Sequence, residues 1–155
     1  MPQANSISNI TPATYQLQFT IPASAPAGTV VNAQIVAFSG ASPQGTVTVP
    51  PDQVWSFTKL YVPTALTINL LLNFTVGQTP QSLNTDTSVI TVQNNSSAVN
   101  PFEVHVIVDS SQTFYFYGST DTAQGTSATT ETVYLAMLQY PVAIAQQLNA
   151  KGIAL

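Results

Sequence analysis

Cysteine and arginine are missing from this sequence, and lysine occurs only twice. Without cysteine the chain cannot form a disulfide, a thiolate metal site or a cysteine nucleophile. Proteins that bind nucleic acids normally neutralise several backbone phosphates with lysine and arginine side chains. Two lysines cannot supply those contacts, so we expect no direct nucleic-acid partner.

Charge of either sign is scarce. Charged residues make up 5% of the chain and the formal net charge is −4, whereas typical globular domains carry about 25%. The polar residues are instead neutral: 21 threonines, 14 serines, 10 asparagines and 14 glutamines. Such a surface changes little when acid protonates carboxylates, and it offers little charge repulsion against association. These properties predict an acid-stable protein that works inside an assembly.

Apolar residues, in contrast, are plentiful. They make up 45% of the chain, which argues against disorder, and 155 residues suffice for one domain with a full core. The leucine cluster at 70–72 is far too short to cross a bilayer. Residues 1–14 lack the basic start and apolar run of a secretory signal peptide, and we expect them to form an extended arm.

Alternation of apolar and polar residues is the dominant pattern, as in strands with one buried face. In YQLQFTI, for example, Tyr15, Leu17 and Phe19 point one way and the glutamines between them point the other way. Nine segments have this character: 15–21, 29–38, 45–49, 53–62, 66–76, 87–92, 102–108, 112–117 and 131–140. Turn residues separate them without interleaved helices, so the sequence predicts an all-β antiparallel sandwich or barrel over 15–140.

The C-terminal segment 141–155 has a different character. Pro141 suits a first helical position, Ile144 and Leu148 are four residues apart, and Gly152 stands where a helix-ending glycine belongs. We therefore expect one short helix over 142–150. The apolar tail from Ile153 to Leu155 is expected to dock on the sandwich or on a neighbouring subunit.

The segment 53–62 contains the only tryptophan and has two partly apolar faces. Strict alternation places Trp55, Phe57 and Tyr61 on one face together with Lys59, and leaves three apolar residues on the other face: Val54, Leu60 and Val62. A strand of this kind is usually covered on both sides. The favoured interpretation is an internal strand covered by its own domain. The alternative is a subunit interface formed by Trp55, Phe57 and Tyr61.

Residues that could carry chemistry are few. His105 is the only histidine, it falls on the face opposite the valines of its strand, and no GxSxG motif accompanies it. Asp109, with the serines after it, could meet Asp121 and hold calcium, but aspartate in turns more often bonds its own backbone. We predict no catalytic residue, metal site, cofactor or small-molecule substrate.

The run FYFY at 114–117 alternates phenylalanine with tyrosine. A face with Tyr115 and Tyr117 can lie under a neighbouring loop, fill a protein interface or stack on a sugar, and these alternatives stay open. Tyr115, Tyr117, Ile153 and Leu155 complete the candidate interface residues.

The strand set over 15–140, the pair VPPDQVWSFTKLYV and LTINLLLNFTV, the arm at 1–14 and the loop at 118–130 together resemble the single jelly-roll capsid proteins of icosahedral viruses. The likeness is greatest to capsid proteins of archaeal viruses from hot acidic habitats. It implies a jelly-roll β-sandwich of eight or nine strands, two sheets face to face, with the short C-terminal helix appended. Abundant asparagine and glutamine fit acid better than heat.

This resemblance also implies a location and partners. Many copies would form the capsid of a virion and contact each other and other capsid or spike proteins. Since the arm carries no basic residue, the genome would be contacted through an internal membrane beneath the shell or through another protein.

Two other functions fit the same composition. A β-sandwich adhesin or spike domain would bind host glycans or a surface protein through Trp55, Tyr115 or Tyr117. A pilus or filament subunit would be all-β as well, but is expected to carry a secretion leader.

Overall fold

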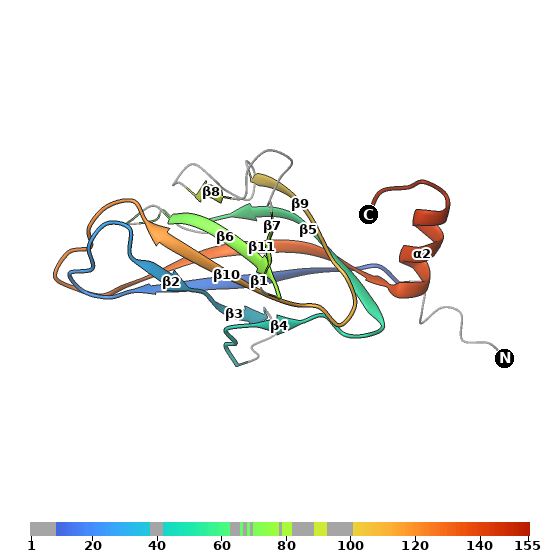
Figure 1. The fold of residues 1–155 in the computed structure, drawn as a ribbon, viewed down its shortest axis with the longest axis horizontal. Helices are drawn as coiled ribbons and strands as arrows, with labels where there is room; N and C mark the ends of the chain where they lie inside the picture. The colour runs from blue at the N-terminus through green and yellow to red at the C-terminus, as the bar shows by residue number, and fades with distance from the viewer. Residues whose placement is uncertain are drawn as a thin grey trace.

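The chain forms a two-layered β-sandwich with one short helix at its end, as the computed structural model in Figure 1 shows. The structure describes residues 9–37, 42–62, 66, 68, 70–77, 79–81, 89–92 and 101–155. Sheets of this kind bury their apolar faces against each other, and the alternation in the sequence provides the matching inward and outward rows.

The first sheet has five strands in the order β3-β1-β11-β5-β9, with antiparallel pairing throughout. Their bounds are β1 Thr11–Ile21, β3 Gln34–Ala37, β5 Gln53–Tyr61, β9 Phe102–Val108 and β11 Thr129–Pro141. The long central pair runs from Thr11 opposite Gln139 to Ile21 opposite Thr129. Because β1 begins at Thr11, the sandwich starts before the expected boundary at residue 15.

The second sheet is built on β10 and β6, which pair antiparallel. Shorter strands line its two sides: β2 and β4 pair with β10, while β7 and β8 pair with β6. The bounds are β2 Val30–Asn32, β4 Val47–Thr48, β6 Leu70–Val76, β7 Thr79–Gln81, β8 Val89–Val92 and β10 Thr113–Thr120.

The pairing order is that of a jelly roll. Eight principal strands follow one another as β1, β2, β5, β6, β8, β9, β10 and β11. The first pairs with the last, the second with the seventh, the third with the sixth and the fourth with the fifth. A long hairpin folded over on itself produces this nesting of pairs, which defines the double-sheet jelly roll. The predicted fold class is confirmed.

The strand prediction differs from the structure in the number of strands and at several strand ends. The segment 29–38 divides at the fully buried Ala33 into β2 and β3, because β2 pairs with β10 in one sheet and β3 with β1 in the other. β7 was not expected. The first two residues of the predicted strand 87–92, residues 87 and 88, lie outside the described residues.

A cluster of phenylalanines fills the space between the sheets. Phe57 from the first sheet meets Phe74 and Phe114 from the second, with ring centroids 5.3 and 5.1 Å apart. Phe116 completes the cluster at 4.9 Å from Phe74. Edge-to-face contacts of this kind add about 0.5–1.5 kcal/mol per pair beyond simple burial. The alternation in FYFY thus places both phenylalanines in the core.

The helix α2 (Val142–Ala150) has the predicted bounds. It stands at one end of the sandwich (Figure 1) and forms a second, smaller apolar cluster. Ala145 is buried there with Val54 and Tyr140, and the half-buried Leu155 packs against them. The tail thus docks partly on its own domain, while Ile153 stays 49% exposed.

Candidate functional site

Trp55 and Phe57 lie in the domain core. Trp55 is 3% exposed and Phe57 is fully buried. The indole Nε1 of Trp55 donates a hydrogen bond to Gln53 Oε1 at 2.7 Å, and its ring lies edge-on to Phe114. These two side chains are therefore not available to a partner, which corrects the alternative that placed them in a subunit interface.

An irregularity in β5 explains why simple alternation misplaced its residues. The register with β11 shifts around Thr58, whose hydroxyl donates to the carbonyl of Ala136 at 3.1 Å. A bulge inserts one residue and reverses the facing of those that follow. Leu60 and Val62 consequently join the same core as Trp55 and Phe57. The outer face of β5 is covered by α2 at Val54.

After this bulge, Lys59 and Tyr61 point to the outer face of the first sheet. The ring of Tyr61 meets that of Tyr134 on β11 edge-on, with centroids 5.3 Å apart. Lys59 stands in register with Glu103 on β9. Tyr61 therefore remains a candidate interface residue, on the face opposite Trp55.

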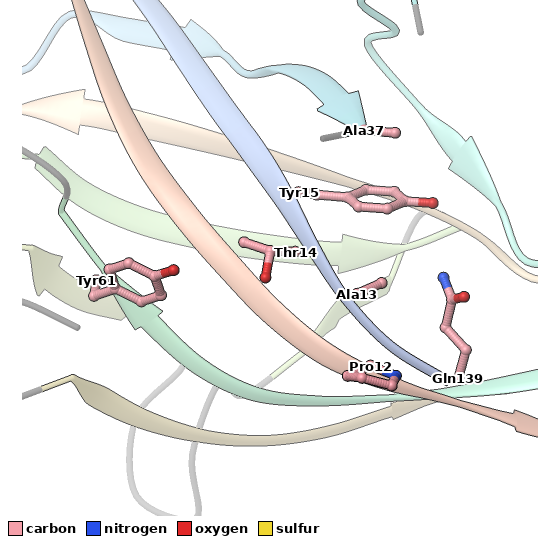
Figure 2. A pocket seen from close by; sticks show the side chains of 7 residues that line it. All are labelled: Pro12, Ala13, Thr14, Tyr15, Ala37, Tyr61 and Gln139. Carbon is pink, nitrogen blue, oxygen red and sulfur yellow. The ribbon is translucent and has the colours of Figure 1, made fainter. Parts of the chain in front are cut away.

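A shallow depression of about 500 Å³ lies near the start of β1. Figure 2 shows the residues that line it: Pro12, Ala13, Thr14, Tyr15, Ala37, Tyr61 and Gln139. Its polar groups are hydroxyls and one carboxamide, and neither a carboxylate nor the histidine is among its lining residues. A site of this composition can hold a neutral polar ligand or a neighbouring chain.

Tyr15 is one of the two tyrosines that line this depression. Burial raises its pKa above the ordinary value for a phenol, and a side-chain hydrogen bond with Gln139 acts in the opposite direction. Its ring lies edge-on to Trp55, with centroids 5.5 Å apart. The neutral phenol is therefore held in place by the core beneath it.

The outer face of the second sheet carries another tyrosine pair. Tyr115 and Tyr117 are half-buried, and their ring centroids lie 6.1 Å apart. Their partners in register on β6 are Thr75 and Asn73. Because Thr75 is buried, the surface beside the pair carries the Asn73 amide and the phenol hydroxyls, and the role of the pair as an interface or ligand site stays a prediction.

Catalytic and metal-binding residues do not converge in the part of the chain that the structure describes. His105 is exposed on the outer face of β9, as expected from its position. No group of three histidine or carboxylate side chains among the described residues could hold a metal ion. None of the described helices is long and apolar enough to span a membrane.

The calcium alternative is wrong, because Asp109 and Asp121 lie beyond opposite ends of β10. This strand has 8 residues, and at about 3.3 Å per residue its ends are roughly 26 Å apart. Asp109 instead belongs to a tight turn, where its carbonyl accepts a hydrogen bond from the amide of Gln112 at 3.2 Å.

A groove of about 370 Å³ separates α2 from the edge of the first sheet. Ile107 on β9, which is 47% exposed, lines it together with Val54 and Leu155. This groove and the depression near Tyr15 were not predicted. Both join residues far apart in the sequence, so only the strand pairing reveals them.

Comparisons with known proteins add little. No protein-family model matches the chain, and no curated protein sequence matches it. Among solved structures, the native structure of a family 35 carbohydrate-binding module from Clostridium thermocellum is similar. It is 12% identical, and the alignment covers 82% of this chain and 97% of that one with a TM-score of 0.38. A likeness this weak carries no argument about function.

Proposed function

We propose that this protein is a structural subunit that assembles with copies of itself into the capsid of a virion. The observation that carries the proposal is the jelly-roll pairing order combined with a nearly uncharged surface. The double-sheet jelly roll is the architecture of many viral capsid domains, although lectins and cupins share it. Function in such a subunit resides in its contact surfaces.

The composition of the surface favours a subunit over a free domain. Each copy carries a formal charge of only −4, so packing many copies together produces little electrostatic repulsion. Large apolar side chains also reach the surface at four described positions: Ile10, Val30, Ile107 and Ile153. Contacts between copies would bury this area, and each Å² of apolar surface removed from water contributes about 25 cal/mol.

Sedimentation velocity and negative-stain electron microscopy of the purified chain test the proposal. We expect oligomers or closed particles at micromolar concentration across pH 3–7, because the chain carries few ionisable side chains: six carboxylates, two lysines and one histidine. A clean monomer at every pH and concentration would contradict the capsid function. Particles in the native source material that contain the protein would support it directly.

A second candidate function is glycan binding by the same sandwich. It is favoured by the half-buried tyrosine pairs on the outer faces of both sheets, Tyr61 with Tyr134 and Tyr115 with Tyr117, since aromatic rings stack on sugar faces and amides bond their hydroxyls. A glycan array tests this candidate. Binding that is lost on Tyr117→Ala or Tyr61→Ala, in a chain that remains monomeric, would favour it over the capsid.

A further inference from the structure

The two sheets differ in the lengths of their edge strands. At the edges of the second sheet stand short strands of 2 to 4 residues: β2, β4, β7 and β8. The first sheet ends at β3 with 4 residues and at β9 with 7. Short edge strands limit pairing with other chains, so β9 is the exception among these edges.

The β3 edge is already occupied. The amide of Ile35 donates to the carbonyl of Gln44 at 2.7 Å, and the amide of Gln44 donates back to Ile35 at 2.9 Å. Within the described ranges, β9 pairs only with β5 and has no strand on its other side. An edge strand in this position presents amide and carbonyl groups to a further strand.

β9 contains neither proline nor lysine, two residues that often prevent edge pairing. It does carry the charged Glu103, and its register with β5 shifts between Phe57 and Lys59. Its inward row of Val104, Val106 and Val108 is buried in the core. Its outward residues are Glu103, His105 and Ile107, all exposed. Among these, an acid and the only histidine stand two positions apart on one face.

We propose that β9 pairs antiparallel with β9 of a second copy, joining two first sheets into one. This inference rests on the proposed function, of which it names one contact. In an isologous antiparallel pair each contact occurs twice. With the two-fold axis at Val104, Glu103 of each copy stands opposite His105 of the other, and Phe102 stands opposite Val106.

Charge complementarity is what selects a second copy as the partner. A carboxylate and an imidazole directly opposite each other across a ladder form a favourable pair, whereas like groups oppose pairing. Moving the axis to His105 would instead place the two histidines against each other and leave both glutamates facing Ile107. Lys59 is in register with Glu103 from the β5 side, so the carboxylate would lie between two cationic or hydrogen-bonding groups.

Cross-linking tests this pairing, because the natural chain has no cysteine. The double variant Glu103→Cys, His105→Cys places cysteines opposite each other in the proposed register. Mild oxidation should convert most of it into a dimer on a non-reducing gel, with mass spectrometry joining position 103 to position 105. The matched control is Gln16→Cys, Gln18→Cys, with the same spacing on β1, whose two sides are paired. We expect at least tenfold less dimer from the control.

Charge reversal provides a second, independent readout. Glu103→Lys should raise the dimer dissociation constant at least tenfold, and adding His105→Glu should restore it, while Thr20→Lys on β1 should have no effect. Unchanged association in Glu103→Lys, or equal cross-linking in both cysteine pairs, overturns the β9 contact. If the wild-type chain forms particles while the double cysteine variant does not cross-link position 103 to position 105, the β9 contact is overturned and the capsid function stands. If the double variant cross-links in this register but the wild-type chain stops at a dimer, the contact stands and the capsid function is overturned. A wild-type chain that stays monomeric overturns both.

Discussion

Replacement of Phe57 by alanine tests whether the aromatic residues of β5 stabilise the domain core or a subunit contact. The side chain is fully buried and meets three rings of the opposite sheet, with centroids 5.1 to 6.1 Å away. Truncating a buried phenylalanine to alanine costs about 3–5 kcal/mol, through lost burial and the cavity left behind. Because Phe57 sits at the centre of the cluster, we expect about 4 kcal/mol.

Urea denaturation measures this loss with a reporter that the chain already contains. Trp55 is the only tryptophan and is buried beside the cluster, so its fluorescence will report exposure on unfolding. With a denaturant slope of about 2 kcal/mol/M, the expected loss shifts the midpoint by roughly 2 M. If the wild-type domain has a typical stability of about 5–15 kcal/mol, the Phe57→Ala variant would still be folded at low temperature without urea.

The matched control is Tyr61→Ala on the outer face of the same strand. Tyr61 is half-buried and has one ring partner, Tyr134, so we expect a loss of about 1 kcal/mol. If Phe57→Ala lowered stability by less than about 1 kcal/mol but dispersed oligomers, the placement of Phe57 in the domain core would be refuted.

Three further outcomes are expected. Glu131→Ala should lower the free energy of unfolding, measured by thermal denaturation, by about 1–3 kcal/mol, because the amide of Ile68 loses the buried carboxylate oxygen that accepts its hydrogen bond at 3.2 Å. Glu131→Gln keeps an acceptor oxygen and should lower it less. Equal losses in the two variants would contradict this role of Glu131. Gly118→Ala should lower the melting temperature, since its Cβ would lie 3.3 Å from the Phe19 ring and overpacking of a core costs about 1–3 kcal/mol. An unchanged melting temperature would show that the Phe19 ring moves aside without loss of stability. Burial raises the Tyr15 pKa, so the contribution of its neutral phenol to the free energy of unfolding is complete below the unfolded-state pKa of about 10 and is lost as pH rises through the folded-state pKa. The urea midpoint of the wild-type chain, measured at pH 8–11, should therefore fall at alkaline pH, and Tyr15→Phe should make this fall smaller. Parallel pH profiles for the two proteins would argue against this role of Tyr15.

Elements whose ends are marked by the sequence itself were predicted well. The bounds of β9 and α2 were predicted as found, because strict alternation marks β9, and Pro141 before the helix and Gly152 after it mark α2. The division of 29–38 was not predicted, since it depends on which strand each half meets. The same holds for the bulge at Thr58, which arises from the register with β11 and leaves no mark in the composition of the strand.

The candidate sites were predicted less completely than the strands. The outward positions of Tyr115, Tyr117 and His105 followed from alternation alone, whereas that of Tyr61 depended on the bulge at Thr58. The depression near Tyr15 required Gln139 to lie beside the start of β1, which only the pairing of the first and last strands brings about. Long-range pairing of this kind is set by the whole core and cannot be read from any one segment.

The adjacency of β1 and β11 at the centre of the first sheet has a consequence for biosynthesis. β1 gains its long neighbour β11 only after residues 129–141 have been synthesised, so the middle of this sheet forms late in the synthesis of the sandwich. Loss of β1 or β11 would remove an interior strand of the first sheet rather than an edge strand. Since Thr11 lies opposite Gln139, the chain enters β1 and leaves β11 for α2 on the same side of the domain.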